Sequence, residues 1–289
     1  MNEDILSILE YKMPTFSKGQ KRIAALICES YDKTAFMTAS ALGKQAGVSE
    51  STVVRFAMEL GYEGYPQMQK AMQEMVLNRL TSVQRMGVTQ DRIGSQDVLS
   101  MVLHSDADKL RQTADTVDRA SFQNAVNQLL QAKNIYIIGA RSAAALAKFF
   151  GYYLQYMFDR VHIITSSNSA EILEQMINIQ SGDAVVAFSF PRYSTSTVEA
   201  VAYCRSVGAA VIGITNSMVS PLAEPCDYVL IAKSDMVSVV DSLVAPLSLV
   251  NALIVALATS KEDALRSKLE RLEAIWQNHH VYEKNGDNL

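Results

Sequence analysis

The sequence predicts two domains of different fold class: an all-α helix-turn-helix domain at the N-terminus, then an α/β domain with a parallel five-stranded sheet flanked by helices. The length of 289 residues is sufficient for two domains. The first 80 residues show only helical periodicity. From residue 135, short apolar segments alternate with helical segments, which is typical of a parallel sheet covered on both faces.

The composition excludes several classes of protein. Apolar residues make up 49% of the chain and charged residues 19%, which excludes a wholly disordered chain. The 26 Lys and Arg against 30 Asp and Glu give a net charge of −4, which excludes a polycationic nucleic-acid coat but allows a local basic face. Three widely separated cysteines, Cys28, Cys204 and Cys226, argue against a disulfide framework or a thiolate zinc site.

We expect a cytoplasmic protein without a membrane anchor. The N-terminus is acidic where a signal peptide needs a basic region. The most apolar stretch, residues 243–258, is interrupted by Pro246, Ser248 and Asn251, and it is shorter than the roughly 20 residues that span a bilayer. A buried helix accounts for this stretch better.

The first domain, which we place at residues 1–78, is predicted to contain helices at 17–30, 38–46, 49–60 and about 66–80. Thr38 and Ser49 are residue types that cap helix starts, and Gly47 and Gly61 are of the type that ends a helix. The helix, glycine-containing turn and helix over residues 38–61 have the spacing of a DNA-reading pair.

The side chains of this pair divide into an inner and an outer set. The apolar set is expected to form the small core of the domain: Ala41, Leu42, Val48, Val53, Val54, Phe56 and Leu60. The polar set is expected to face outward and contact DNA: Lys44, Ser49, Ser51, Thr52 and Arg55. Short hydroxyls at a helix start can approach phosphates and base edges, and an arginine one turn later can contact guanine or a phosphate.

A modest basic surface supports this interpretation. Between Lys12 and Met58 the chain has seven basic residues and three acidic ones. The alternative is an ordinary helical hairpin, in which Ser49 is only a cap and Arg55 a solvated charge.

The rest of the chain is assigned to a linker and connecting helix at 79–120, an α/β domain at 121–265 and a C-terminal helix and tail at 266–289. The polar stretch 81–96 is the linker itself. Strands are predicted at 135–139, 161–165, 183–190, 210–215 and 228–232, and the following helices at 142–158, 170–179, 194–207, 243–258 and 261–276.

Two predicted strand ends carry the residues of a ligand site. Ligands of open parallel sheets bind beyond the carboxyl ends of the strands, where helix N-termini offer free N–H groups. The first loop contributes Gly139, Arg141 and Ser142, and the second contributes Ser189, Arg192, Ser194, Thr195 and Thr197. Hydroxyls and arginines at a helix start suit a phosphate or a carboxylate. The alternative is helix capping in ordinary surface loops.

Neither an enzyme nor a cofactor site is predicted. The first loop is not G-x-G-x-x-G and no acidic residue follows at the expected distance, which argues against a dinucleotide cofactor. The bases available to an aldose-ketose isomerase are Glu171, Glu199 and His162, and each has a plain structural explanation. The remaining histidines, His104, His279 and His280, have no metal-ligand spacing.

The segment AGVSESTVVRFAMELGYEGYPQMQK closely resembles the N-terminal domain of the RpiR family of bacterial transcriptional regulators. The matching positions are Gly47, Val48, Ser49, Thr52, Val53, Val54, Arg55, Phe56, Leu60, Gly61, Gly64 and Tyr65. The second half resembles the SIS (sugar isomerase) domain, whose loops are commonly G-x-G-x-S and S-x-S-G-x-T. Here Arg141 and Arg192 stand where those loops have glycines.

The resemblance implies a DNA-binding regulator of carbohydrate metabolism whose SIS domain binds a phosphorylated or anionic sugar effector. It also implies a homodimer or tetramer, with residues 243–258 and the last helix as pairing surfaces, that binds palindromic operator DNA. Two other classes stay open: a phosphosugar isomerase with a helical head that does not bind DNA, and an interaction module whose head binds protein.

Overall fold

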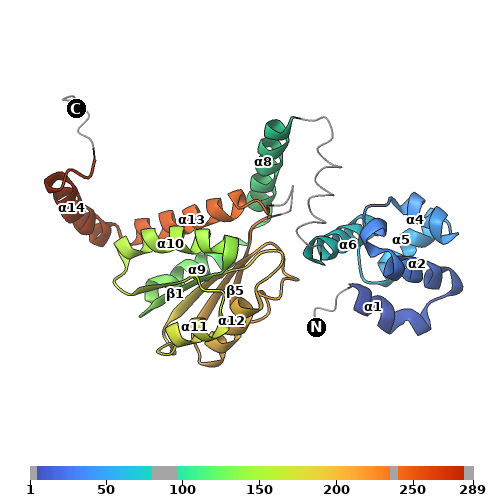
Figure 1. The fold of residues 1–289 in the computed structure, drawn as a ribbon, viewed down its shortest axis with the longest axis horizontal. Coiled ribbons are helices and arrows are strands. Elements are labelled where there is room, and N and C mark those ends of the chain that lie inside the picture. Colours follow the sequence, from blue (N-terminus) through green and yellow to red (C-terminus); the bar gives the residue numbers. More distant parts are fainter. Residues whose placement is uncertain (1–4, 80–96, 235–239, 283–289) are drawn as a thin grey trace. The chain divides into compact units, whose positions relative to one another are not determined.

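The computed structural model describes residues 5–79, 97–234 and 240–282. The chain divides into two units, Met1–Gly94 and Ser95–Leu289, each with its own buried core. The first is helical, and the second contains a five-stranded parallel sheet flanked by helices (Figure 1). The predicted fold class is confirmed. The predicted linker 81–96 lies outside the described residues, and the finer domain boundaries stay predictions.

The first unit consists of short helices around one apolar core. Its elements are α1 (Ile5–Lys12), η1 (Met13–Thr15), α2 (Lys18–Glu29), α3 (Tyr31–Thr34), α4 (Ala39–Ala46), α5 (Glu50–Glu59) and α6 (Tyr65–Arg79). Phe56 lies fully buried at the centre, with its ring edge-on to Phe16 at 5.2 Å between centroids. The helices α1 and α3 were not predicted.

The helix-turn-helix pair α4–α5 forms as its capping residues predict. The Oγ of Thr38 accepts from Ala41 N at 3.2 Å, and Gly47 ends α4 in the left-handed conformation with φ of 66°. Gly43 lies against the turn, because a Cβ there would meet the carbonyl oxygen of Val48 at 3.0 Å. The predicted inner position of Ala41 is wrong: Ala41 is exposed, and Ala46 is buried one turn later.

The sheet of the second unit is parallel throughout, in the order β2-β1-β3-β4-β5. Its strands are β1 (Ile135–Gly139), β2 (Val161–Ile164), β3 (Ala184–Phe188), β4 (Ala210–Thr215) and β5 (Tyr228–Ile231). The order reverses direction between β1 and β3, which pair from Ile135 with Ala184 to Gly139 with Phe188. This is the switch point, where parallel sheets place their ligand crevice.

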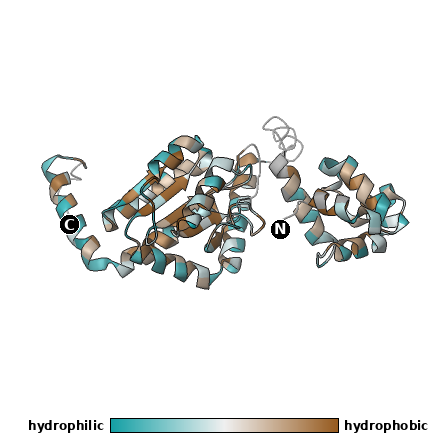
Figure 2. Cartoon of the chain, turned by 90° about the horizontal axis from the view of Figure 1, so that it is seen from below, coloured by the Kyte–Doolittle hydropathy of each residue, from teal (hydrophilic) through white to brown (hydrophobic). Residues whose placement is uncertain are grey.

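Helices cover both faces of this sheet. The helices of the second unit are α8 (Val98–Thr116), α9 (Arg119–Gln131), α10 (Ala144–Met157, preceded by η2, Arg141–Ala143), α11 (Ser169–Gln175), α12 (Thr195–Ser206), α13 (Val244–Ser260) and α14 (Glu262–Asn278). One face packs against α9, α10 and α13 and the other against α11 and α12. Hydrophobic residues accordingly concentrate along the strands (Figure 2).

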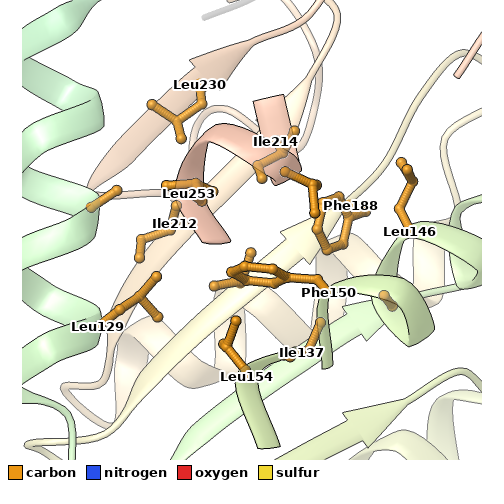
Figure 3. Packing of buried hydrophobic residues seen from close by; sticks show 14 of the residues in the cluster. Leu129, Ile137, Leu146, Phe150, Leu154, Phe188, Ile212, Ile214, Leu230 and Leu253 are labelled. Atoms are coloured by element: carbon orange, nitrogen blue, oxygen red, sulfur yellow. The ribbon is translucent and has the colours of Figure 1, made fainter. Parts of the chain in front are cut away.

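Successive side chains of the central strands point to opposite faces of the sheet, as the two-residue period of a strand requires. Ile137 and Phe188 face α10, where Phe150 packs edge-on to Phe188 at 6.3 Å between centroids (Figure 3). Ile138 and Val185 face α11 and α12. Burial on this second face raises the pKa of the Cys204 thiol to about 12, so that it is neutral at physiological pH.

Helix α8 is tied to the carboxyl edge of the sheet. The backbone N–H of Lys233, just past β5, donates to Thr113 Oγ1 at 2.9 Å. Ser242, just before α13, donates to Asp106 Oδ1 at 2.6 Å. Lys109 is only 4% exposed and donates to Ser105 Oγ at 2.6 Å. The connecting helix is therefore part of the second unit and contacts the edge that carries the predicted ligand loops.

In the described ranges, no single helix is both long and apolar enough to cross a membrane. Only α13 and α14 meet that test jointly, as a pair bent by 99°.

Candidate functional site

The predicted DNA-contacting residues lie on α4, at the start of α5 and on its first turns. Lys44 near the end of α4 and Ser51 and Arg55 on α5 are exposed, and Thr52 is half-buried. Ser49 caps α5, since its Oγ accepts from Thr52 N at 3.3 Å and lies 2.9 Å from Ser51 Oγ. Arg55 Nε donates to Ser51 O at 3.4 Å. The structure thus places hydroxyls and the guanidinium group along the first turns of α5.

Basic residues of α2 lie next to the α4–α5 pair, although the motif itself does not include them. The start of α2 packs on the turn, because a Cβ on Gly19 would lie 3.4 Å from Val48 Cγ1. The Arg22 guanidinium lies over the turn, since a Cβ on Gly47 would come within 3.1 Å of its Nη1. Lys18, Lys21 and Arg22 are all exposed. The excess of basic residues in this segment was the signal that could have identified them.

Helix α6 fixes the loop that precedes α4. Tyr65 Oη and Gln69 Nε2 both donate to the carbonyl oxygen of Met37, each at 2.6 Å. Burial raises the pKa of Tyr65 to about 12, so its hydroxyl remains a donor through the physiological range of pH. The start of α4 is therefore held by contacts within the first unit.

The predicted ligand loops follow β1 and β3, which are neighbours in the sheet. Gly139 at the end of β1 has no room for a side chain: a Cβ would lie 2.6 Å from the carbonyl oxygen of Ala143 and 3.0 Å from Ala147 Cβ. The absence of a side chain lets the backbone of η2 and α10 close over the strand end. The exposed residues Arg141 and Ser142 begin that turn.

Arg141 and Arg192 share an uncommon backbone conformation. Their φ angles are +57° and +63°, in the left-handed region that glycine adopts readily and other residues rarely. These are the two positions where SIS-type loops commonly have glycine. Each loop therefore carries an exposed guanidinium group on a backbone conformation that favours glycine. A non-glycine residue in this region costs of order 1 kcal/mol, and such strain clusters at ligand sites.

The start of α12 gathers the hydroxyls of the second loop. Ser194 stands at the N-cap position of α12 without a side-chain capping bond, and its Oγ lies 2.7 Å from Ser196 Oγ. Thr195 is exposed, and Ser189 is buried just after β3. Thr197, in the first turn, is fully buried, and within the described residues its Oγ1 has no hydrogen-bond partner. Leaving a buried hydroxyl unsatisfied costs about 1 to 3 kcal/mol.

A polar network at the end of β4 supports the second loop, and no predicted site residue belongs to it. Tyr193 Oη donates to Asn216 Oδ1 at 2.8 Å, which ties the residue after Arg192 to the neighbouring strand end. Thr215 Oγ1 donates to Ser220 Oγ at 2.9 Å beside it. The sequence signal that could have identified this network is the pair of polar residues Thr215 and Asn216 at the end of a buried strand.

The residues considered for an isomerase have structural partners. Glu171 lies in the first turn of α11 and accepts from Ser166 Oγ at 2.6 Å. Glu199 is an exposed residue of α12 and accepts from Ser169 Oγ at 3.4 Å. His162 stacks on Tyr136 at 4.6 Å between ring centroids. Among the described residues, no three acidic, histidine or cysteine side chains are grouped to hold a metal ion.

Comparison with known proteins assigns both units. Residues 3–78 match the helix-turn-helix domain of the rpiR family, and residues 128–256 match the SIS domain. The chain is 24% identical to the HTH-type transcriptional regulator HexR of Pseudomonas aeruginosa, over 76% of this chain and 76% of that protein. It is 29% identical to HexR of Escherichia coli, over 77% of this chain and 74% of that protein.

Two solved structures are similar. The sugar isomerase domain of an RpiR transcription factor from Sphaerobacter thermophilus aligns with a TM-score of 0.59 and 26% identity, over 62% of this chain and 99% of that chain. The NanR protein of Vibrio vulnificus, complexed with ManNAc-6P, aligns with a TM-score of 0.59 and 24% identity, over 94% of this chain and 97% of that chain.

The matched domains stand in the order and at the positions of the two units, and the related proteins are regulators rather than isomerases. The chain belongs to the RpiR family of DNA-binding transcriptional regulators, with a helix-turn-helix head and a SIS domain.

Proposed function

We propose that this protein is a cytoplasmic regulator that binds operator DNA through α5 and responds to a phosphorylated or otherwise anionic sugar at the carboxyl edge of its sheet. The observation that carries the effector proposal is the pair of arginines at the ends of β1 and β3. Both retain a left-handed backbone that glycine would adopt without strain. A guanidinium group at each position gives the site two donors suited to a phosphate or a carboxylate.

The proposed effector site comprises Gly139, Arg141, Ser142, Ser189, Arg192, Ser194, Thr195 and Thr197. The N-terminus of α12 adds free backbone N–H groups to the arginines and hydroxyls, and this end of a helix favours negative charge. The relative NanR is described in complex with ManNAc-6P, a sugar phosphate, which supports the same ligand class here. Anionic sugars are therefore expected to bind more tightly than neutral sugars.

The proposed regulation is a linkage between two binding events. An effector that changes operator affinity by a given factor must have its own affinity changed by the same factor when the operator binds. Operator half-sites lie about 34 Å apart or a multiple of it, so reading a palindrome requires at least two heads. We propose a homodimer or a tetramer as the active form.

The test is a titration of operator binding at fixed salt, repeated with a panel of phosphosugars, sugar acids and neutral sugars. A shift of operator affinity by one anionic compound supports both parts of the proposal. Turnover of a phosphosugar without specific DNA binding would establish the isomerase alternative instead. Salt-independent binding to DNA would contradict phosphate contact by the head.

Replacing Arg55 by alanine is expected to weaken specific operator binding by about 1 to 3 kcal/mol if Arg55 reads a base edge. Arg55 is exposed on α5, so the head should remain folded. The matched control is Lys33→Ala, which removes an exposed charge from α3, outside the α4–α5 pair. Unchanged operator affinity in Arg55→Ala, measured by fluorescence anisotropy, would remove Arg55 from the recognition set.

Replacing Arg192 by glycine is expected to have opposite effects on stability and on effector binding. Glycine removes the left-handed strain, so thermal stability should rise by up to about 1 kcal/mol. Loss of a charge-assisted hydrogen bond should weaken the binding of the anionic effector by about 1.5 to 3 kcal/mol. Arg192→Ala serves as the companion variant, because it loses the guanidinium group but keeps the strain. If the wild type, Arg192→Gly and Arg192→Ala all responded equally to the effector, the proposed role of Arg192 would be contradicted.

Replacing Thr197 by valine tests the buried hydroxyl. Valine has nearly the same shape and removes an unsatisfied polar atom, so the unliganded protein should be as stable as before or more stable. If a bound effector forms a hydrogen bond with this hydroxyl, the affinity for the effector should fall in Thr197→Val and be retained in Thr197→Ser. Calorimetric titration and thermal unfolding separate the two effects, and an unchanged affinity in Thr197→Val would exclude this residue from the site.

A further inference from the structure

A cleft lies at the amino edge of the sheet, the edge opposite the predicted ligand loops. It has a volume of about 310 Å³, and three separate parts of the second unit form its walls: the α9–β1 turn, the α10–β2 turn and the junction of α13 with α14. Its charged lining residues are Lys133, Asp159, Arg160 and Lys261, and we call it the amino-edge cleft.

The length of a strand separates this cleft from the proposed effector site. Ile135, which lines the cleft, begins β1, and Gly139 ends it. At about 3.3 Å per residue the two positions lie roughly 13 Å apart. Backbone bonds hold the turns that carry the cleft, because Lys133 N donates to Gly182 O and Ile135 N donates to Arg160 O, each at 2.9 Å. The amino-edge cleft is therefore a different place in the fold.

Packing holds two of the cations of the cleft in place. The aliphatic part of Lys133 lies over Gly182, where an added Cβ would come within 3.5 Å of its Cδ and Cε. Lys261 is half-buried: its Nζ donates to Met157 O at 3.3 Å and lies 4.3 Å from the centroid of the Phe158 ring. These side chains lose less conformational freedom when a ligand binds than solvated lysines would.

The charge of the cleft is positive because its carboxylate is already paired. Lys268 Nζ bonds Asp159 Oδ1 at 2.6 Å and, with the charges of Lys261 and Arg160, holds the pKa of that carboxyl group below its usual value. Lys268 is not part of the lining. Within the described residues, the side chains of Lys133 and Arg160 form no salt bridge or hydrogen bond, and both are exposed. An excess of positive charge thus remains for a ligand.

The chemistry of the lining indicates an anion that is recognised by charge. Guanidinium and ammonium groups suit phosphates and carboxylates, and arginine can donate to either with two parallel bonds. The other four lining residues are apolar, so the described lining offers no hydroxyl or amide side chain to read the pattern of sugar hydroxyls. The volume is at the lower end of the range for ligand pockets, about 300 to 1,000 Å³.

We propose that the amino-edge cleft binds a compact anion with two or more negative charges, carried by phosphate or carboxylate groups. This second anion site goes beyond the proposed function and does not depend on it. A bound anion joins Lys261, at the junction of α13 and α14, to the turns that precede β1 and β2. Binding to the folded state alone also stabilises the second unit.

The first test maps the site on the wild-type chain by acetylation of lysines, read by mass spectrometry. Pyrophosphate is the probe, and potassium chloride at equal ionic strength is the reference. Pyrophosphate is expected to slow the acetylation of Lys133 and to leave that of Lys33, an exposed lysine of α3, unchanged. Citrate in place of pyrophosphate shows whether carboxylates are also accepted. Equal acetylation of Lys133 with both anions and with potassium chloride would overturn the proposal.

The second test measures the affinity for pyrophosphate by calorimetric titration. All variants are made in the Arg192→Ala chain, which lacks one guanidinium group of the proposed effector site. Arg160→Gln is expected to weaken binding at least about tenfold, because charge-assisted hydrogen bonds are lost. The matched control is Arg111→Gln, which removes an exposed arginine of α8 outside the cleft and should leave the affinity unchanged.

The third test looks for a gain of affinity, which a misfolded protein does not produce. Asp159→Asn removes the negative charge from the cleft and is expected to strengthen binding about fivefold, the effect of one charge at about 4 Å in water. The Asp159 side chain is 86% exposed, so the fold should persist. Equal affinities in the Arg192→Ala chain with and without Arg160→Gln and Asp159→Asn would contradict the assignment of the anion to this cleft.

These outcomes are separable from the proposed function. If Lys133 is protected but operator DNA and anionic sugars do not bind, the amino-edge cleft stands and the proposed function fails. If operator binding responds to an anionic sugar while Lys133 stays unprotected, the proposed function stands and the second anion site fails.

Discussion

Replacing Phe56 by alanine is expected to destabilise the N-terminal unit by about 3 to 5 kcal/mol, the usual cost of removing a buried aromatic ring. Phe56 is fully buried at the centre of the first core, and its ring packs edge-on against Phe16 at 5.2 Å. A loss of this size is a large fraction of the stability of a small domain. Operator binding should disappear with it.

The second unit has its own core, so the same variant should still bind the effector. Calorimetry should therefore show one transition shifted to lower temperature and the other retained. Met58→Ala is the control on the same helix, because Met58 is 57% exposed and its truncation should change stability by less than about 0.5 kcal/mol. Loss of effector binding in Phe56→Ala would contradict the independence of the two cores.

Replacing Gly139 by valine is expected to remove the effector response and destabilise the second unit by about 3 kcal/mol, the upper end of the range for overpacking. The added Cβ would lie 2.6 Å from the carbonyl oxygen of Ala143, which belongs to the backbone and cannot rotate away. The turn that carries Arg141 must therefore move. Operator binding by the folded head should persist without regulation.

Gly64→Ala is a control for adding a Cβ atom to a glycine where there is room for it. A Cβ there would meet only Pro66 Cδ at 3.7 Å, which is ordinary contact, so little loss of stability is expected. Thermal unfolding and the effector titration together check the prediction. A Gly139→Val protein with normal stability and normal regulation would show that the close approach at the end of β1 is not required.

The strands were predicted to within two residues, because each is a short, nearly continuous run of apolar residues between polar or glycine-containing segments. A continuous run such as Ile135–Ile138 must be buried on both faces, and only a central parallel strand provides that. The helix-turn-helix was equally well marked by Thr38, Gly47 and Ser49, whose local chemistry fixes where helices begin and end. Patterns of this kind depend on near neighbours only.

Features that depend on distant packing could not be predicted. Ala41 and Ala46 are both small apolar residues of α4, and only the position of α2 and α5 decides which of them is buried. The left-handed backbone of Arg141 and Arg192 is imposed by the closed loops against the preference of the side chains. The bond of Tyr193 to Asn216 joins residues 23 positions apart, beyond any local pattern. The residue types of the candidate site could thus be predicted from the sequence, whereas the backbone strain and the supporting hydrogen bonds around it could not.

The polar contacts of α8 hold the helix to the sheet edge from its middle onward. All of its described polar contacts with the sheet edge come from Asp106 onward, while Val98, Leu99 and Leu103 toward its start are exposed. From Asp106 back to Val98 the helix rises roughly 12 Å, at about 1.5 Å per residue. A tilt of about 5° about Asp106 therefore displaces Val98 by about 1 Å. A tilt that barely moves the sheet edge is thus largest at Val98, the end of α8 that is nearest in sequence to the helix-turn-helix unit.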